Sequence, residues 1–145
     1  MKVSRPHPEP TPETEPFWDG AKRHVLMVQY CPECHQYQFY PRPFCVRCSC
    51  ESLEWREISG LGTVYSFTVV WRPPLPDWPV PYVVAIVELD EGVRLLANVI
   101  SEDALDVHIG SRVRVAFECQ PDDWVLPQFM YVSDEKARIG GPGAP

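Results

Sequence analysis

The second half of the chain alternates between apolar and polar residues in short runs, which is the pattern of half-buried β-strands. β-Branched and aromatic residues dominate these runs, and the turn-forming triplet Asp-Glu-Gly at 90–92 divides the longest one. Five strands with little helix predict a small, partly closed OB-type barrel, with a small β-sandwich as the main alternative. We expect strands of roughly 6–10 residues: one at 62–71, two within 82–100, one at 111–120 and one at 124–133.

Two positions in these runs carry specific expectations. Pro127 has no N–H to donate, so we expect the last strand to lie at an edge of the sheet. Cys119 follows Val113, Val115 and Phe117 at alternate positions, so we expect it to be a buried apolar residue.

Apolar residues recur at rough helical spacing over residues 17–26, which predicts one or two short helices near the N-terminus. Thr14 stands where a capping residue is expected, and Pro16 suits the first helical turn. Gly20 lowers the helix propensity, so the helices should be short. The chain should be extended again by residues 27–30.

Two segments are rich in proline. Residues 1–16 contain five prolines and predict an extended arm or linker. Residues 72–81, the Pro-rich loop, contain five more, which excludes a helix or a central strand and predicts a stiff loop. Trp78 near the tip of this loop is a candidate partner contact, with packing as a lid over the barrel end as the alternative.

These patterns divide the chain into four parts. A Pro-rich arm is followed by a helical and cysteine-containing segment, then by the barrel, then by a loose Gly/Pro-containing tail. The boundaries that we expect are 1–16, 17–58, 59–133 and 134–145.

Composition and charge narrow the possible functions. The net charge is −7 and no segment of the chain is basic, whereas binding to a nucleic-acid backbone needs a Lys/Arg face. No apolar run reaches the roughly 18 residues of a membrane span, and the N-terminus lacks the apolar core of a secretory signal. We therefore expect a cytoplasmic protein, in which paired cysteines favour metal binding over disulfides.

Residues 31–48 contain two Cys-x-x-Cys pairs, and each pair can present two sulfurs to one metal ion from a tight turn. A closed shell of four thiolates leaves no position for a substrate, so such a site stabilises a small module. Iron in the same cage, serving electron transfer, is the alternative to zinc. We expect Cys50 to lie outside the shell. The sequence predicts one structural zinc per chain, held by Cys31, Cys34, Cys45 and Cys48.

The sequence contains no recognisable catalytic constellation. None of the four histidines has a nucleophile at a familiar spacing, and there is neither a Gly-rich phosphate loop nor a Gly-x-Ser-x-Gly elbow. We therefore expect the chain not to be an enzyme by itself.

Five segments resemble, in order, a domain-of-unknown-function family that is associated with acyl-CoA. The cysteines are the most specific, together with GTVYSFTVV and VPYVVAIVELDEG. A Gly-Ser commonly follows the fourth cysteine in this family, whereas the present chain has Ser49-Cys50. The resembling segments are residues 16–20, 30–48, 53–74, 80–100 and 109–118.

The resemblance implies an N-terminal rubredoxin-like zinc ribbon and a C-terminal OB fold. It also implies an accessory subunit of thiolase-superfamily enzymes: acetoacetyl-CoA thiolase with hydroxymethylglutaryl-CoA synthase in archaea, or lipid-transfer-type thiolase homologues in actinobacteria. The latter act as aldolases on steroid side-chain CoA thioesters. Some members are fused to, or work with, MaoC-type enoyl-CoA hydratases, and the arm at 1–16 is similar to the linker of such a fusion.

The leading hypothesis is a non-catalytic subunit of a hetero-oligomer that docks a thiolase-like enzyme and helps to hold its acyl-CoA. The candidate partner contacts are Phe17, Trp18 and Trp78. The candidate channel residues are Tyr65, Trp71 and Tyr82 for the pantetheine arm, with Arg72, Lys22 and Arg23 for phosphate. The alternative is that the aromatics are core and the cations solvated.

The runner-up belongs to another class of protein. OB folds bind single-stranded nucleic acid through stacking aromatics in a basic groove. The aromatics are present in this sequence, but the basic groove is not.

Overall fold

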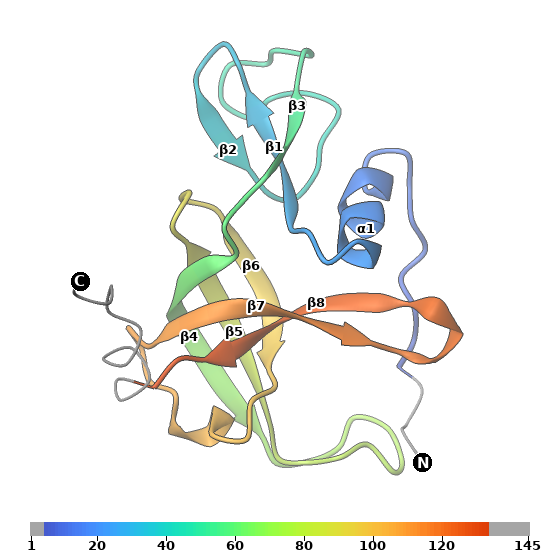
Figure 1. The fold of residues 1–145 in the computed structure, drawn as a ribbon, viewed down its shortest axis with the longest axis vertical. Coiled ribbons are helices and arrows are strands. Elements are labelled where there is room, and N and C mark those ends of the chain that lie inside the picture. The colour runs from blue at the N-terminus through green and yellow to red at the C-terminus, as the bar shows by residue number, and fades with distance from the viewer. Residues whose placement is uncertain (1–4, 134–145) are drawn as a thin grey trace, which may run out of the picture.

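The computed structural model describes residues 5–133, which form a small sheet with one helix above a closed β-barrel (Figure 1). The predicted tail at 134–145 lies outside the described residues. The mainly β class, the cysteine ribbon and the five-stranded barrel are all confirmed, and closure of the barrel excludes the sandwich.

The helix α1 spans Glu15–Lys22, so the segment forms one short helix. Pro16 lies in its first turn, as expected. Thr14 occupies the N-cap position but makes no side-chain cap; its Oγ1 instead accepts a hydrogen bond from the Thr11 amide at 2.8 Å. Thr14 thus stabilises the turn that leads into the helix. No helix in the described part of the chain is long and apolar enough to cross a membrane.

The upper sheet consists of β1 (Met27–Cys31), β2 (Gln36–Gln38) and β3 (Glu54–Glu57), in the order β2-β1-β3 and antiparallel throughout. We call this sheet with its cysteine loops the ribbon. The α1 helix lies beside the ribbon and above the β7–β8 hairpin (Figure 1), and it contacts both β1 and β8.

The barrel strands occur where alternation predicts them. Their bounds are β4 Leu61–Val70, β5 Tyr82–Leu89, β6 Arg94–Val99, β7 Arg112–Cys119 and β8 Val125–Tyr131, with short 3₁₀ turns η1 at Ala104–Asp106 and η2 at Pro121–Asp123. The strands close in the order β4-β5-β6-β8-β7. Every pairing is antiparallel except that of β6 with β8.

Alternate residues of these strands fill the barrel. Val83, Ala85, Val87 and Leu89 of β5 are all buried, which is the period expected of a strand with one face toward the core. Phe129 of β8 is fully buried among them. The core continues upward to Leu26, Val28 and Ile58, so that the ribbon and the barrel share one apolar cluster.

β8 lies between β6 and β7, so the prediction that Pro127 marks an edge strand is wrong. β8 pairs with β7 along its whole length but with β6 only where Phe129 meets Val99. The Phe129 carbonyl accepts a hydrogen bond from the Ile100 amide at 2.9 Å, and residue 127 faces the same side of the strand. The missing N–H of Pro127 therefore faces a stretch where β6 is not paired, and no ladder bond is lost.

Side chains replace the ladder where β6 and β8 diverge, a region that we call the β6–β8 seam (residues 95–98 and 126–128). Gln128 Oε1 accepts a hydrogen bond from the Asn98 amide at 2.7 Å. Asn98 Nδ2 donates to the Val83 carbonyl at 3.0 Å and so ties the seam to β5. Gln128 itself is buried, so these bonds satisfy groups that water does not reach.

The prediction that Cys119 is buried is wrong, because this residue is exposed. Cys119 ends β7 and pairs with Val125 at the tip of the β7–β8 hairpin. Figure 1 shows this hairpin extending beyond the barrel. The alternation of apolar and polar residues in β7 therefore continues into a part of the strand that has no core beneath it.

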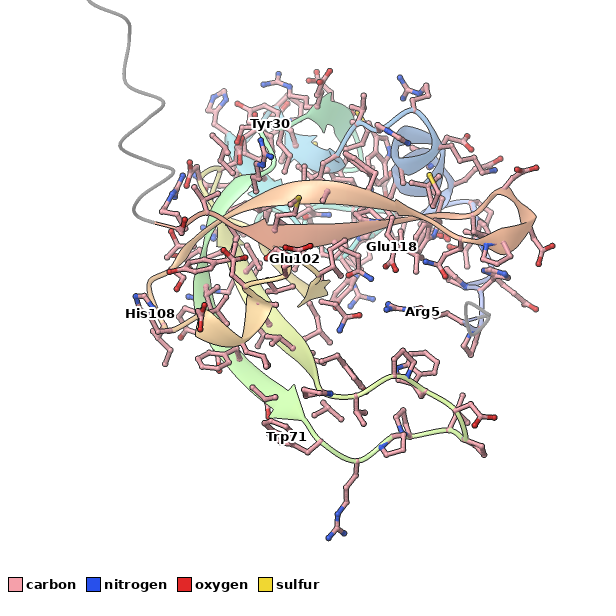
Figure 2. All side chains as sticks on the ribbon, turned by 60° about the horizontal axis from the view of Figure 1, so that its bottom comes forward. Arg5, Tyr30, Trp71, Glu102, His108 and Glu118 are labelled. Carbon is pink, nitrogen blue, oxygen red and sulfur yellow. The ribbon has the colours of Figure 1, made fainter. Side chains whose placement is uncertain are left out.

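The described part of the predicted arm lies against the barrel. Arg5 Nη1 donates to Asn98 Oδ1 at 2.9 Å and lies 3.7 Å from Glu118 Oε2. The same guanidinium lies 5.5 Å from the centre of the Trp78 ring. Figure 2 shows Arg5 between Glu118 on β7 and the Pro-rich loop. Arg5 therefore connects three segments that are distant in sequence.

Replacing Arg5 with alanine is expected to loosen the Pro-rich loop while leaving the barrel folded. The lost contacts are partly exposed, so the free energy of unfolding should fall by only about 1 kcal/mol. Hydrogen exchange of the Trp78 amide, which donates to the Leu75 carbonyl at 3.2 Å, should accelerate, since the loop loses its contact with Arg5. Arg72→Ala, in the same loop, is the matched control. Equal effects of the two substitutions would show that Arg5 has no specific holding role.

Candidate metal centre and adjoining cavity

The four predicted cysteines come together at one end of the ribbon. Cys31 ends β1, Cys34 follows it in the turn to β2, and Cys45 and Cys48 lie on the loop that leads to β3. Their four sulfurs lie within 4.8 Å of one another. The Sγ atoms of Cys31 and Cys48 are 3.5 Å apart, and those of Cys34 and Cys45 are 3.6 Å apart.

The two Cys-x-x-Cys turns are built alike. The amide of the residue after each pair, His35 or Ser49, donates to the carbonyl of the first cysteine of that pair at 2.9 Å. Both residues have positive φ, 57° for His35 and 62° for Ser49. Glycine favours this conformation. Ser49 thus adopts the backbone that a glycine would take, and its departure from the family pattern leaves the turn unchanged.

The local environment gives the four thiols different pKa values. The backbone amides of Cys48 and Arg47 lower the pKa of Cys45 to about 6, whereas burial raises the pKa of Cys34 to about 12. The pKa of Cys31 is lowered as well, first by the Cys34 amide. Four thiolates at this spacing repel one another, so full ionisation requires a bound cation.

The geometry fits zinc. A tetrahedral ion with Zn–S bonds of about 2.3 Å separates its sulfurs by about 3.8 Å, close to the two distances given above. Cys50 is not part of the sulfur cluster; its carbonyl accepts the Cys45 amide at 2.8 Å and its Sγ accepts the Ser52 amide at 3.3 Å. Cys50 therefore supports the loop behind the site.

A pair of buried glutamines holds the loop that carries Cys45, and sequence reasoning did not find it. Gln38 Nε2 donates to Gln29 Oε1 at 2.8 Å across the β1–β2 pair. Gln29 also bonds both the amide and the carbonyl of Arg42, at 2.9 and 2.8 Å. Gln38 Oε1 accepts the Val46 amide at 3.1 Å. The two side chains thus satisfy a loop that lacks strand partners.

Replacing Gln38 with leucine is expected to lower the free energy of unfolding of the ribbon by about 1–3 kcal/mol, since the Val46 amide and Gln29 lose their partner. Zinc should dissociate faster, because the loop carrying Cys45 is no longer held. A chromogenic chelator would measure the rate of zinc release. Gln36→Leu, at an exposed position two residues earlier in β2, is the control. An unchanged rate in Gln38→Leu would contradict this role.

An apolar cavity of about 380 Å³ lies where the ribbon, α1 and the β6–β8 seam meet. The ribbon contributes residues 39–41, and the helix contributes Phe17 and Trp18. Its other lining residues come from the segment before the helix and from the barrel: Thr14, Val84, Leu95, Leu96, Ala97, Asn98, Leu126, Pro127 and Gln128. None of these residues carries a charge.

Comparison with known proteins identifies the architecture. Residues 18–54 match the family described as "ChsH2, rubredoxin-like zinc ribbon domain", and residues 55–118 match "ChsH2, C-terminal OB-fold domain". A "DUF35 domain-containing scaffold protein" of Methanocaldococcus jannaschii is 34% identical over 110 residues, which is 73% of this chain and 77% of that protein. The chain belongs to the DUF35 scaffold family. The family resemblance drawn from the sequence is thereby confirmed.

Two further relatives link this DUF35 chain to enzymes. It is similar to a chain in the solved structure of the "Ltp2-ChsH2(DUF35) aldolase", with 32% identity and a TM-score of 0.79 over 86% of this chain and 98% of that one. The "3-oxo-4,17-pregnadiene-20-carboxyl-CoA hydratase alpha subunit" of Mycobacterium tuberculosis is 37% identical over 119 residues, which is 82% of this chain. The chain spans about 40% of the length of the hydratase subunits it matches.

The structure does not gather the candidate acyl-CoA residues of this DUF35 chain into one wall. Tyr65 lies on β4 with the Arg94 guanidinium 3.7 Å from its ring centre. Trp71 and Arg72 are exposed just after β4, and Figure 2 shows Trp71 at the opposite side of the barrel from Tyr30 of the ribbon.

The remaining cations lie by the helix. Lys22 Nζ is 5.9 Å from the ring centre of Trp124, and Arg23 is exposed at the C-cap of α1.

The structure brings together only some of the candidate aromatics. Tyr82 and Trp78 have ring centres 6.3 Å apart and line a second cavity of about 330 Å³, together with Arg5. Phe17 is buried and Trp18 half-buried, and both line the first cavity. The candidate partner contacts are therefore divided between two cavities, whose linings share only Asn98 of β6.

Proposed function

We propose that this chain is a non-catalytic accessory subunit that binds a thiolase-type enzyme of the Ltp2 class and helps to accommodate its acyl-CoA substrate. One observation carries the proposal: the likeness, at 32% identity, to almost the whole of a chain in the Ltp2-ChsH2 aldolase. The scaffold names of archaeal relatives agree with a role in assembly. The chain would contribute binding surfaces to the complex, and the partner would contribute the catalytic groups.

The ribbon supports this role as a structural element. Cys31, Cys34, Cys45 and Cys48 would hold one zinc ion, which would contribute folding free energy and leave no open position for a substrate. Because the ribbon shares its apolar cluster with the barrel, the metal would fix the orientation of one module on the other.

The acyl-CoA part of the proposal assigns the thioester to the partner's active site and gives this chain part of its walls. Tyr82 and Trp78 are better placed for a pantetheine arm than Tyr65, because they line a shared cavity. Arg72 in the Pro-rich loop remains a candidate for a phosphate contact. Steroid side-chain thioesters are the favoured substrate class, since the hydratase relative is named for such a compound. A MaoC-type hydratase, fused or associated, is the second proposed partner.

Reconstitution tests the proposal. The purified chain is mixed with an Ltp2-type aldolase and examined by size-exclusion chromatography with light scattering, and cleavage of a steroid side-chain β-hydroxyacyl-CoA is then measured. We expect one hetero-oligomeric peak, cleavage by the complex and no turnover by the chain alone. Separate elution of the two proteins, or turnover by the isolated chain, would refute the proposal.

Fluorescence anisotropy with a labelled single-stranded oligonucleotide provides the contrasting measurement. Tight binding at physiological salt would favour a nucleic-acid function of the OB barrel over the accessory role. We expect none, because the chain has an excess of seven negative charges.

A further inference from the structure

Large apolar side chains are exposed around the mouth of the first cavity. Tyr40 of the ribbon is 59% exposed and Leu96 of β6 is 60% exposed, and both line this cavity. Ile86 of β5 pairs with Leu96 and is also exposed. We call these three residues with the cavity between them the Tyr40–Leu96 face. Exposed apolar clusters of this kind mark interaction sites in soluble proteins.

The Tyr40–Leu96 face is formed by both modules. Tyr40 follows Phe39, whose ring lies 5.4 Å from that of Phe17 in α1, so the helix supports the ribbon side of the cavity. The barrel side is the β6–β8 seam, where Asn98 and Gln128 already bond each other. A partner that covers this face therefore contacts the ribbon, the helix and the barrel at once.

The chemistry of the lining restricts what can occupy the cavity. Its fourteen residues include no acid and no base, although 23% of the chain is charged. The charged groups that border this lining already have partners: Arg94 pairs with Glu88 at 2.8 Å, and Arg5, which donates to Asn98 Oδ1, lies 3.7 Å from Glu118 Oε2. A phosphate or nucleotide would find no countercharge there, whereas an apolar side chain would be desolvated on all sides.

We propose that the Tyr40–Leu96 face is the docking surface for the thiolase-type partner, which inserts an apolar side chain between the ribbon and the β6–β8 seam. This inference rests on the proposed function and identifies the surface through which the chain would bind its partner. A protein fits better than a free acyl chain, because Tyr40, Ile86 and Leu96 extend the apolar area outside the cavity onto the open surface. An apolar anchor seated in a pocket and surrounded by such a rim is the usual centre of a protein–protein interface.

The test measures the affinity of the full chain for an Ltp2-type aldolase by surface plasmon resonance. Leu96→Glu and Tyr40→Ala should each weaken binding by at least about 30-fold, the change typical of losing a central interface residue. Ile109→Glu is the matched control, because Ile109 is 69% exposed and lines neither the first nor the second cavity. Zinc content and thermal unfolding verify that each variant is folded. Leu96→Ala provides a milder variant if Leu96→Glu does not fold.

Each outcome distinguishes the surface from the function. If wild-type protein binds the aldolase and the Tyr40 and Leu96 variants bind equally well, the surface is wrong and the proposed function stands. If wild-type protein does not bind, both fail. A dimer of the isolated chain that Leu96→Glu converts to a monomer would assign the face to self-association instead. Binding of an acyl-CoA by the isolated chain, lost in Leu96→Glu, would assign the cavity to the ligand.

Discussion

Replacing Cys34 with serine is expected to abolish stoichiometric zinc binding and to unfold the ribbon, the largest effect that we expect of any single substitution in this chain. Structural zinc in comparable small modules contributes an apparent 10–16 kcal/mol, roughly, at neutral pH, and the ribbon has only three short strands to retain its fold without the metal. The barrel should persist, because its five strands pair only with one another and close without a strand from the ribbon. Elemental analysis and amide NMR would report the two modules separately.

Two other cysteines provide the controls for Cys34→Ser. Cys50→Ser and Cys119→Ser should each retain one zinc per chain, since neither belongs to the sulfur cluster. Loss of zinc in Cys50→Ser would mean that Cys50, rather than Cys48, completes the shell. Iron in the purified protein would instead assign the ribbon to electron transfer.

Replacing Phe129 with alanine is expected to lower the free energy of unfolding of the barrel by about 3–5 kcal/mol, a large part of the stability of a typical domain. Phe129 is fully buried, and it stands at the one position where β8 pairs with both neighbours. The substitution leaves a cavity at the point where the barrel closes. Urea unfolding, followed by the far-ultraviolet circular dichroism of the barrel, would measure the change.

Ile109→Ala is the control for Phe129→Ala. Ile109 is an exposed apolar residue that precedes β7, so its truncation should change the unfolding midpoint little. A loss below about 1 kcal/mol in Phe129→Ala would show that neighbouring side chains collapse into the space, and that closure of the barrel does not depend on this ring.

The features that local periodicity determines could be predicted from the sequence. Alternation identified all five barrel strands to within two residues, because each strand has one face in a continuous core. The Cys-x-x-Cys spacing identified the four clustered sulfurs, because two such turns are a self-contained geometric unit. Closure was predicted only in part, as a partly closed barrel, because five short strands are also compatible with a small sandwich; the structure shows a closed barrel.

The features that depend on tertiary neighbours could not be predicted. Gln29 and Gln38 have polar side chains on short strands, and nothing local shows that they face a loop rather than water. Pro127 suggested an edge because the sequence does not tell where β6 diverges from β8. Cys119 continues the alternation of apolar and polar residues in β7 beyond the end of the core, and the sequence does not show where that core ends. The apolar cavity is made by five separate segments of the chain, so no single sequence motif predicts it.

The order of the barrel strands has a consequence for how the chain is made. During synthesis from the N-terminus, all four cysteines have been added by residue 48, whereas β8, which must enter between β6 and β7, ends only at Tyr131. The ribbon can therefore bind its metal while the barrel is still an open sheet. Until the last strand inserts, β6 and β7 each have an edge of unpaired backbone groups, the condition under which nascent strands mispair. A chain truncated before β8 would thus contain all four clustered cysteines but leave β6 and β7 with unpaired, aggregation-prone edges.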